Sequence, residues 1–193
     1  LTAFAASLWV SAANAQVGGA TIQENGLGFC RVQGTIDSNH TGYTGSGFAN
    51  ADNATGTGVD WSVSVSAGGV YQLQWRFANG STSRPGSVKV NGAHVATIGF
   101  PSTGVWNSWT TVNTTVTLNA GWNSIRLDAA TSAGLANIDS LTVSGGGTVQ
   151  AGPCDGGTTE ILIEENTGGF CGLDGSVDSN HAGFTGTGFA NGN

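Results

Sequence analysis

The chain has 193 residues, of which only 9% are charged and 33 are glycine, and its formal net charge is −7. An apolar fraction of 38% is too high for a disordered chain, and the composition favours short strands joined by glycine and asparagine turns. A nucleic-acid or anionic-lipid partner is excluded, because residues 16–154 are nearly balanced in charge and residues 155–193 contain no Lys or Arg.

Residues 1–15 are predicted to be the C-terminal part of a secretory signal peptide. The run from Leu1 to Ala13 is apolar or small, and Ala13-Asn14-Ala15 has the small-x-small pattern of a cleavage site before Gln16. The run is too short to span a bilayer. We therefore expect a secreted, extracellular protein.

Cysteine usage fits export, since the chain has three cysteines: Cys30, Cys154 and Cys171. We expect Cys30 to pair with Cys154, which would tie the start of a first module to its end. Cys171 would then pair with a residue beyond Asn193. The alternative is three free, buried thiols.

An internal repeat divides the chain. Residues 21–50 and 162–191 align without a gap and share 18 of 30 positions, including Gly-Phe-Cys and Asp-Ser-Asn-His. One repeat of about a domain's length indicates tandem domains rather than a solenoid. We expect a complete module over residues 16–144, a Gly-rich linker over 145–160, and the truncated start of a second module over 161–193.

The strands of the first module follow a period of two. In residues 71–77 Tyr, Leu, Trp and Phe alternate with Gln and Arg, and residues 61–66 alternate in the same way. Asn91-Gly92 predicts a hairpin between residues 87–90 and 94–98. Further strands are expected over residues 110–118, 124–128 and 138–143. The pattern predicts an all-β, jelly-roll-like sandwich of two antiparallel sheets.

The tryptophans differ in their settings. Trp61 and Trp75 lie on alternating strands and are expected in the core, Trp109 is expected to pack, and Trp122 lies at a turn that fits either role. Trp106 lies in a loop that contains Pro and Gly. An exposed aromatic ring in such a loop is unfavourable unless a ligand or another part of the protein packs on it. It either stacks on a ligand or plugs its own loop.

These features resemble the family 6 and family 35 carbohydrate-binding modules, and family 35 more closely through Gly42-Tyr43-Thr44-Gly45-x-Gly47-Phe48. The resemblance covers about residues 20–143. Further motifs of the family occur in order: Arg76-Phe77-Ala78-Asn79-Gly80, Arg84-Pro85, Val90-Asn91-Gly92, Thr103-Gly104-x-Trp106-x-x-Trp109 and Asn137-Ile138-Asp139.

The resemblance implies a non-catalytic sugar-binding site in the loops at one end of the sandwich. It puts the stacking ring at Trp106 and a hydroxyl-binding amide at Asn137. Phe48 or Tyr43 is similar in place to a second aromatic that sandwiches the sugar in some members. The ligand would be a plant cell-wall polysaccharide or oligosaccharide.

The resemblance also implies a structural calcium ion. Its ligands would be Gln23 and Asn25 on the first strand and Asp139 near the last, and oxygen ligands of this kind suit Ca²⁺. Glu24, between the first two, is expected to point to the opposite face. Ordinary hydrogen bonding at a strand edge is the alternative for Gln23 and Asn25.

Some family 35 members bind uronic acids through a second calcium at the sugar site. The segment Asn50-Ala51-Asp52-Asn53 offers candidate oxygen ligands for that ion, and Arg84 is a candidate partner for the sugar carboxylate. An Asx turn and a solvated arginine are the alternatives. Neutral sugars such as mannan, xylan or galactan remain open as ligands.

The predicted function is thus a binding module of a secreted enzyme that degrades plant cell walls, with the catalytic domain beyond residue 193. Two other classes remain open on the residues alone. One is a small β-sandwich enzyme that acts on glycans, and the other is a structural or adhesive surface domain without sugar affinity.

Overall fold

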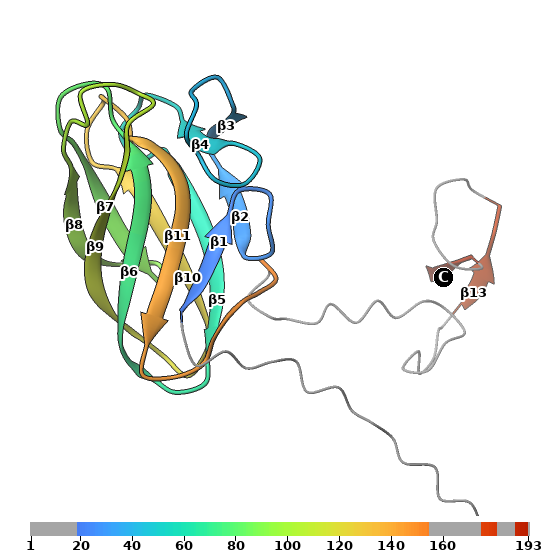
Figure 1. Cartoon of the computed structure of the whole chain (residues 1–193). Coiled ribbons are helices and arrows are strands. Elements are labelled where there is room, and N and C mark those ends of the chain that lie inside the picture. The colour runs from blue at the N-terminus through green and yellow to red at the C-terminus, as the bar shows by residue number, and fades with distance from the viewer. Residues whose placement is uncertain (1–18, 155–174, 181–187, 193) are drawn as a thin grey trace, which may run out of the picture. The chain divides into compact units, whose positions relative to one another are not determined.

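The structure, a computed structural model, describes residues 19–154, 175–180 and 188–192 (Figure 1). The predicted signal peptide and Cys171 lie outside the described residues. The chain divides into two compact units, residues 1–157 and 158–193. Within the described residues no helix has the length and hydropathy needed to cross a membrane.

The first unit is the predicted sandwich of two antiparallel sheets, and the described residues contain no helix. One sheet has the order β3 (Gly34–Asp37), β4 (Phe48–Ala51), β11 (Asn137–Gly145), β6 (Gly69–Ala78), β9 (Trp109–Leu118), with β1 (Ala20–Gln23) also paired to β11. The other has the order β12 (Val149–Ala151), β5 (Gly58–Val65), β10 (Gly121–Ala129), β7 (Arg84–Val90), β8 (Ala93–Phe100), with β2 (Phe29–Val32) also paired to β5.

The core lies between the two sheets and follows from the alternation of the strands. Tyr71, Leu73, Trp75 and Phe77 of β6 are all buried, and the residues between them face outward or are half-buried. Trp61 of β5 faces them from the other sheet and is 2% exposed. The prediction that Trp61 and Trp75 are core residues is confirmed.

The predicted linker begins later than the sequence suggested. Residues 149–151 form β12, which pairs with Val63–Val65 of β5, and Cys154 forms a disulfide with Cys30 of β2. Because β12 and β2 pair with neighbouring stretches of β5, the disulfide joins β2 to the chain just after β12, on the same edge of β5. The predicted Cys30–Cys154 pairing is confirmed.

The described part of the second unit is one hairpin, β13 (Gly175–Asp178) paired with β14 (Phe189–Gly192). Gly175 pairs with Gly192 and Asp178 with Phe189, which is the pairing of Gly34 with Ala51 and of Asp37 with Phe48 in β3–β4. The repeated sequence thus forms the same hairpin in the same register.

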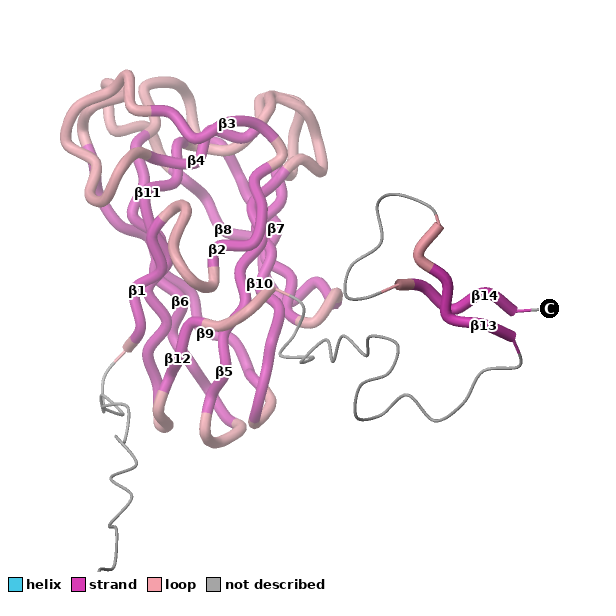
Figure 2. The backbone as a smooth tube through the Cα atoms, turned by 90° about the vertical axis from the view of Figure 1, so that its right-hand side faces the viewer, coloured by secondary structure: helices cyan, strands magenta, loops and turns pink. Residues whose placement is uncertain are grey.

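The loops that concern function gather at the end of the sandwich where β3 and β4 lie, at the top of Figure 2. Five connections meet there: β3–β4, β4–β5, β6–β7, β8–β9 and β10–β11. Hydrogen bonds between them, described below, hold this end together.

Candidate functional site

A cavity of about 160 Å³ opens among these loops, and polar residues and one tryptophan line it. Five predicted residues meet in it, and one residue that was not predicted, His40, joins them. The predicted residues are Asn50, Asn53, Arg84, Trp106 and Asn137. The predicted residues Tyr43, Phe48 and Asp52 are not among the lining residues. The set offers amide groups, an imidazole, a guanidinium and an aromatic ring.

Trp106 is held on the β8–β9 loop by the chain around it. A Cβ at Gly80 would lie 2.5 Å from Trp106 Cδ1, so the ring packs directly on a position that must be glycine. The loop itself is fixed, because Thr103 N donates to Asn79 O at 2.7 Å and Asn79 N donates to Thr103 Oγ1 at 3.0 Å. The ring is half-buried and borders the cavity.

Arg84, the first residue of β7, joins three loops to Trp106. Its Nε donates to Ser81 Oγ at 3.0 Å, and its Nη1 donates to Asn53 Oδ1 at 3.0 Å and to Leu135 O at 2.8 Å. Its Cζ lies 5.0 Å from the centroid of the Trp106 ring, within the range of a cation–π contact. A solvated arginine, the alternative from the sequence, is therefore wrong.

The charge of Arg84 has no counter-ion among the described residues. Burial lowers the pKa of its guanidinium from the ordinary value, because the charged form loses solvent. All its hydrogen-bond acceptors are neutral. The other three arginines and the one lysine of the chain all form ion pairs with aspartates: Arg31, Arg76, Arg126 and Lys89.

The second aromatic of the site is His40 rather than Phe48 or Tyr43. Phe48 has 0% exposure and therefore presents no surface to a ligand. Its ring stacks on His40 at 5.9 Å, and His40 in turn stacks on Trp106 at 6.3 Å. Tyr43 packs behind them, 6.0 Å from Phe48. Phe48 precedes Ala49, a core residue, so it lies on the opposite face of β4, where the rings of His40, Tyr43 and Trp109 pack against it. Motif matching did not reveal this burial.

The amide side chains at the site differ in their burial and in whether they already form hydrogen bonds within the protein. Asn137 is 5% exposed at the start of β11 and lines the cavity. Asn50 donates from Nδ2 to Asp37 Oδ2 at 2.8 Å. The Asp52 side chain is exposed, and its neighbour Asn53 reaches the cavity instead. The expected carboxylate of the loop thus lies outside the cavity.

The predicted calcium ligands are only partly brought together. Gln23 Nε2 donates to Thr44 Oγ1 at 2.8 Å, and Asp139 accepts from Thr44 N and Oγ1, both at 2.7 Å. Asn25, in contrast, is exposed in a turn with a φ of 56°. Asp139 also forms an ion pair with Arg76 at 2.7 Å.

Glu24, and not Asn25, lies beside Gln23 at the β3–β4 loop. It is 5% exposed, and its Oε1 accepts from Ser46 N, Ser46 Oγ and Gly47 N at 2.5, 2.9 and 2.7 Å. The prediction that Glu24 points to the other face is wrong, because β1 ends at Gln23 and the chain turns there.

Side-chain oxygens of Gln23 and Glu24 lie close together beside Gly45, and we call this place the oxygen-rich point. A Cβ at Gly45 would lie 2.7 Å from Glu24 Oε1 and 3.1 Å from Gln23 Oε1. Glu24 Oε2 is buried without a hydrogen-bond partner in the described structure. Since the described residues hold no group of three His, Cys, Asp or Glu side chains, an ion here would need amide or backbone oxygens as well. Such ligands suit Ca²⁺.

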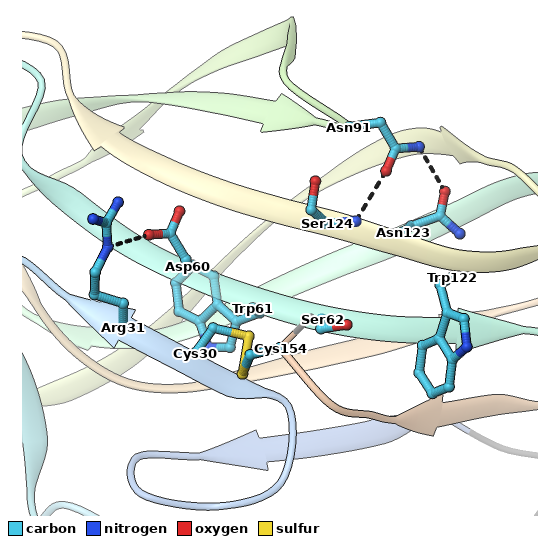
Figure 3. Close-up of a pocket in the computed structure, with 10 residues that line it drawn as sticks. All are labelled: Cys30, Arg31, Asp60, Trp61, Ser62, Asn91, Trp122, Asn123, Ser124 and Cys154. Carbon is cyan, nitrogen blue, oxygen red and sulfur yellow. Dashed lines mark hydrogen bonds and ion pairs between the residues drawn. A yellow bond between two sulfur atoms is a disulfide. The ribbon is translucent and has the colours of Figure 1, made fainter. Parts of the chain in front are cut away.

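A larger cavity of about 570 Å³ lies elsewhere, beside the disulfide (Figure 3). Trp122, 36% exposed, borders it. The asparagine side chains that line this cavity form hydrogen bonds within the protein: Asn91 donates to Asn123 Oδ1 at 3.0 Å and accepts from Ser124 N at 2.9 Å. Asn123 Nδ2 donates to two backbone carbonyls. This polar lining holds the β7–β8 turn to β10, and we take the loop cavity as the candidate site.

Known proteins match the first unit. The family model described as carbohydrate binding module (family 6) matches residues 29–145. Endo-1,4-beta-xylanase B of Cellvibrio japonicus is 50% identical over 136 residues, which are 69% of this chain and 22% of that protein. The chain thus spans about a fifth of that relative's length.

Two solved structures are similar over nearly their whole length. The CBM35 from Cellvibrio japonicus Abf62 is 49% identical with a TM-score of 0.69, and the match covers 70% of this chain and 99% of that one. Xyl-CBM35, in complex with a glucuronic acid containing disaccharide, is 48% identical with a TM-score of 0.67, over 69% and 98%.

Proposed function

The chain belongs to the family 6 carbohydrate-binding modules, with family 35 modules among its solved relatives, and from this membership we propose that its loop cavity binds an acidic sugar of a plant cell-wall polysaccharide. That the module binds rather than cleaves sugars was predicted and is confirmed by the family match. The two other classes left open by the sequence, a glycan-active enzyme and an adhesive domain, do not fit this family.

The observation that supports an acidic sugar as the ligand is the unpaired charge of Arg84. A half-buried guanidinium is normally paired with a carboxylate, whereas Arg84 has only neutral hydrogen-bond acceptors and borders the cavity. A uronate carboxylate would supply it in a charge-assisted hydrogen bond. The relative Xyl-CBM35 was solved with a glucuronic acid containing disaccharide, which agrees with this proposal.

The size of the cavity supports recognition of one sugar unit. A volume of about 160 Å³ is below the range of about 300–1,000 Å³ usual for drug-sized ligands. The module would therefore bind the end or a side branch of a polysaccharide. The binding would be weak, with a Kd of about 10⁻³ to 10⁻⁵ M.

Calorimetric titration tests the proposal. We expect the protein to bind glucuronic acid and a glucuronic acid containing disaccharide more tightly than xylo- or manno-oligosaccharides. Equal or tighter binding of the neutral sugars would contradict it. The titrations are repeated with a chelator, because loss of uronate binding in chelator would assign the carboxylate to an ion at the cavity instead of to Arg84.

Replacing Arg84 by glutamine should remove the preference for uronates. Because Arg84 also joins three loops, the informative quantity is the ratio of the affinities for glucuronic acid and glucose, which cancels a general loosening of the site. A charged hydrogen bond of about 1.5–3 kcal/mol corresponds to a roughly 10- to 150-fold fall in this ratio. An unchanged ratio would show that Arg84 only holds the loops.

The oxygen-rich point beside Gly45 is proposed to hold a structural calcium ion, with Glu24 and Gln23 as side-chain ligands. The buried, unpartnered Glu24 Oε2 supports it, since an uncompensated carboxylate oxygen is costly. The ion would stabilise the β3–β4 loop, which Glu24 already binds through Ser46 and Gly47.

Calcium should therefore raise the melting temperature. A hundredfold excess over Kd contributes about 2.7 kcal/mol, which corresponds to roughly 10 °C. Glu24→Gln should abolish the difference between calcium and chelator, whereas Asn25→Ala should keep it. A calcium effect that persists in Glu24→Gln would place the ion elsewhere.

The whole protein is proposed to be a secreted enzyme that degrades plant cell walls, with two such modules in tandem. Endo-1,4-beta-xylanase B is a carbohydrate-active enzyme of which this chain matches 22%, and the Cys30–Cys154 disulfide fits an oxidising compartment. The identical register of β13–β14 and β3–β4 supports a second module. Linked modules would gain avidity for a polysaccharide.

A further inference from the structure

The imidazole of His40 packs against two aromatic rings at the edge of the loop cavity. Its centroid lies 5.9 Å from Phe48 and 6.3 Å from Trp106, with interplanar angles of 27° and 21°. Since Phe48 is fully buried, its ring anchors His40 to the interior of the protein. The other ring is Trp106, the aromatic residue of the cavity.

The backbone that follows His40 is also fixed. Trp109 Nε1 donates to Thr41 O at 2.9 Å, and Arg76 Nη2 donates to Gly42 O at 2.8 Å. Both donors come from neighbouring strands of the same sheet, β9 and β6. His40 is therefore positioned before any ligand arrives, by the fixed backbone that follows it and by its two ring contacts.

The ring separation decides how a ligand can meet His40. Carbon atoms in contact lie about 3.5–4.0 Å apart, so a sugar between two parallel rings would need a separation of at least about 7 Å. The His40 and Trp106 centroids are only 6.3 Å apart. A sugar therefore cannot be sandwiched between them, and it meets the edge of the imidazole.

That edge carries both ring nitrogens, and no group of the described residues forms a hydrogen bond with either. The contrast with His94 is informative, because its Nδ1 is paired with Ser87 Oγ at 2.9 Å. The other polar groups of the cavity are partly used: Arg84 Nε and Nη1 bind the loops, and Asn50 Nδ2 binds Asp37. An in-plane imidazole N–H is thus available to the cavity.

We propose that His40 is a ligand-contacting residue that donates a hydrogen bond from its imidazole to an oxygen of the bound sugar. The proposal rests on the proposed function, since it names a further contact in the same site. Trp106 would then supply the apolar face, Arg84 the charge, and His40 a directional donor. Stacking fixes that donor, so little entropy is lost when the hydrogen bond forms.

The test compares two variants by titration with a glucuronic acid containing disaccharide. His40→Phe keeps a flat ring in the stack but removes the N–H, and we expect roughly 5- to 15-fold weaker binding. His94→Phe is the matched control and should bind like the unchanged protein. Equal affinity of His40→Phe and the unchanged protein would overturn the proposal.

A measurement on the unchanged protein covers the case in which His40→Phe does not fold. In ¹H–¹³C spectra of the imidazole groups, the His40 signal should shift on addition of the disaccharide while the His94 signal stays in place. A stationary His40 signal in protein that binds the disaccharide would overturn the role of His40 alone. Absence of any binding by the unchanged protein would overturn the proposed function together with it.

Discussion

Replacing Trp106 by alanine is expected to abolish measurable sugar binding. The ring is the apolar face of the loop cavity, and its position is fixed by Gly80, Arg84 and His40. Removing a central aromatic contact of this kind costs about 2–4 kcal/mol, a roughly 30- to 1,000-fold loss of affinity. From a Kd of about 10⁻³ to 10⁻⁵ M, most of that range lies beyond calorimetric detection.

The matched control is Trp122→Ala. Trp122 is also a partly exposed tryptophan, but it borders the cavity beside the disulfide. The titration with a glucuronic acid containing disaccharide should be unchanged in this variant. If Trp122→Ala lost binding and Trp106→Ala kept it, the sugar site would lie in the larger cavity, and our choice of site would be wrong.

A folded variant is needed for this comparison, and the structure suggests that Trp106→Ala folds. The ring is half-buried at the loop end and does not belong to the core between the sheets. We expect a melting temperature within a few degrees of the unchanged protein. A large fall would instead favour the other role that the sequence allowed, a plug that stabilises its own loop.

The long strands could be predicted because each repeats its alternation several times. Strand β6 buries every second residue from Tyr71 to Phe77, and the Asn91-Gly92 turn has the positive φ values, 50° and 81°, that its sequence predicts. Strands β1 to β4 and β12 have only three or four residues each. A period of two has no statistical weight over so few positions, so their pairing depends on tertiary contacts.

The candidate site was predictable where one residue type had an unusual setting. Trp106 stood out as an aromatic in a Pro- and Gly-containing loop, and the structure places it at the cavity. His40 gave no such signal, because its role depends on rings of Phe48 and Trp106 that the fold brings to it from other loops and strands. Glu24 was assigned to the wrong side because the alternation was extended past the end of β1.

The β3–β4 loop connects the proposed calcium point with the sugar cavity. Residues Ser46 and Gly47 bind Glu24, Thr44 binds Asp139, and the same loop presents His40 to the cavity. Loosening the loop at Glu24 should therefore weaken sugar binding without removing any ligand contact. The site is thus supported by groups that lie outside it.

Removing the disulfide is expected to have the largest effect on stability. The bond between Cys30 and Cys154 closes a loop with a sequence separation of 124, and cross-links of about 100 residues restrict the unfolded chain by up to about 4.7 kcal/mol. The double variant Cys30→Ser/Cys154→Ser should lose about 3–5 kcal/mol, or roughly 10 °C in melting temperature. Both cysteines are replaced so that neither can pair with Cys171.

A reductant provides the control for this prediction. It should lower the melting temperature of the unchanged protein towards that of the double variant and leave the double variant unaffected. In the native state the bond joins β2 to the chain just after β12, along the edge of β5 away from β10. Because the sugar cavity lies among other loops, the double variant should keep its affinity at temperatures well below melting. Loss of affinity in folded double variant would show that β2 and β12 also position the loop end, a coupling that the contacts at the cavity do not predict.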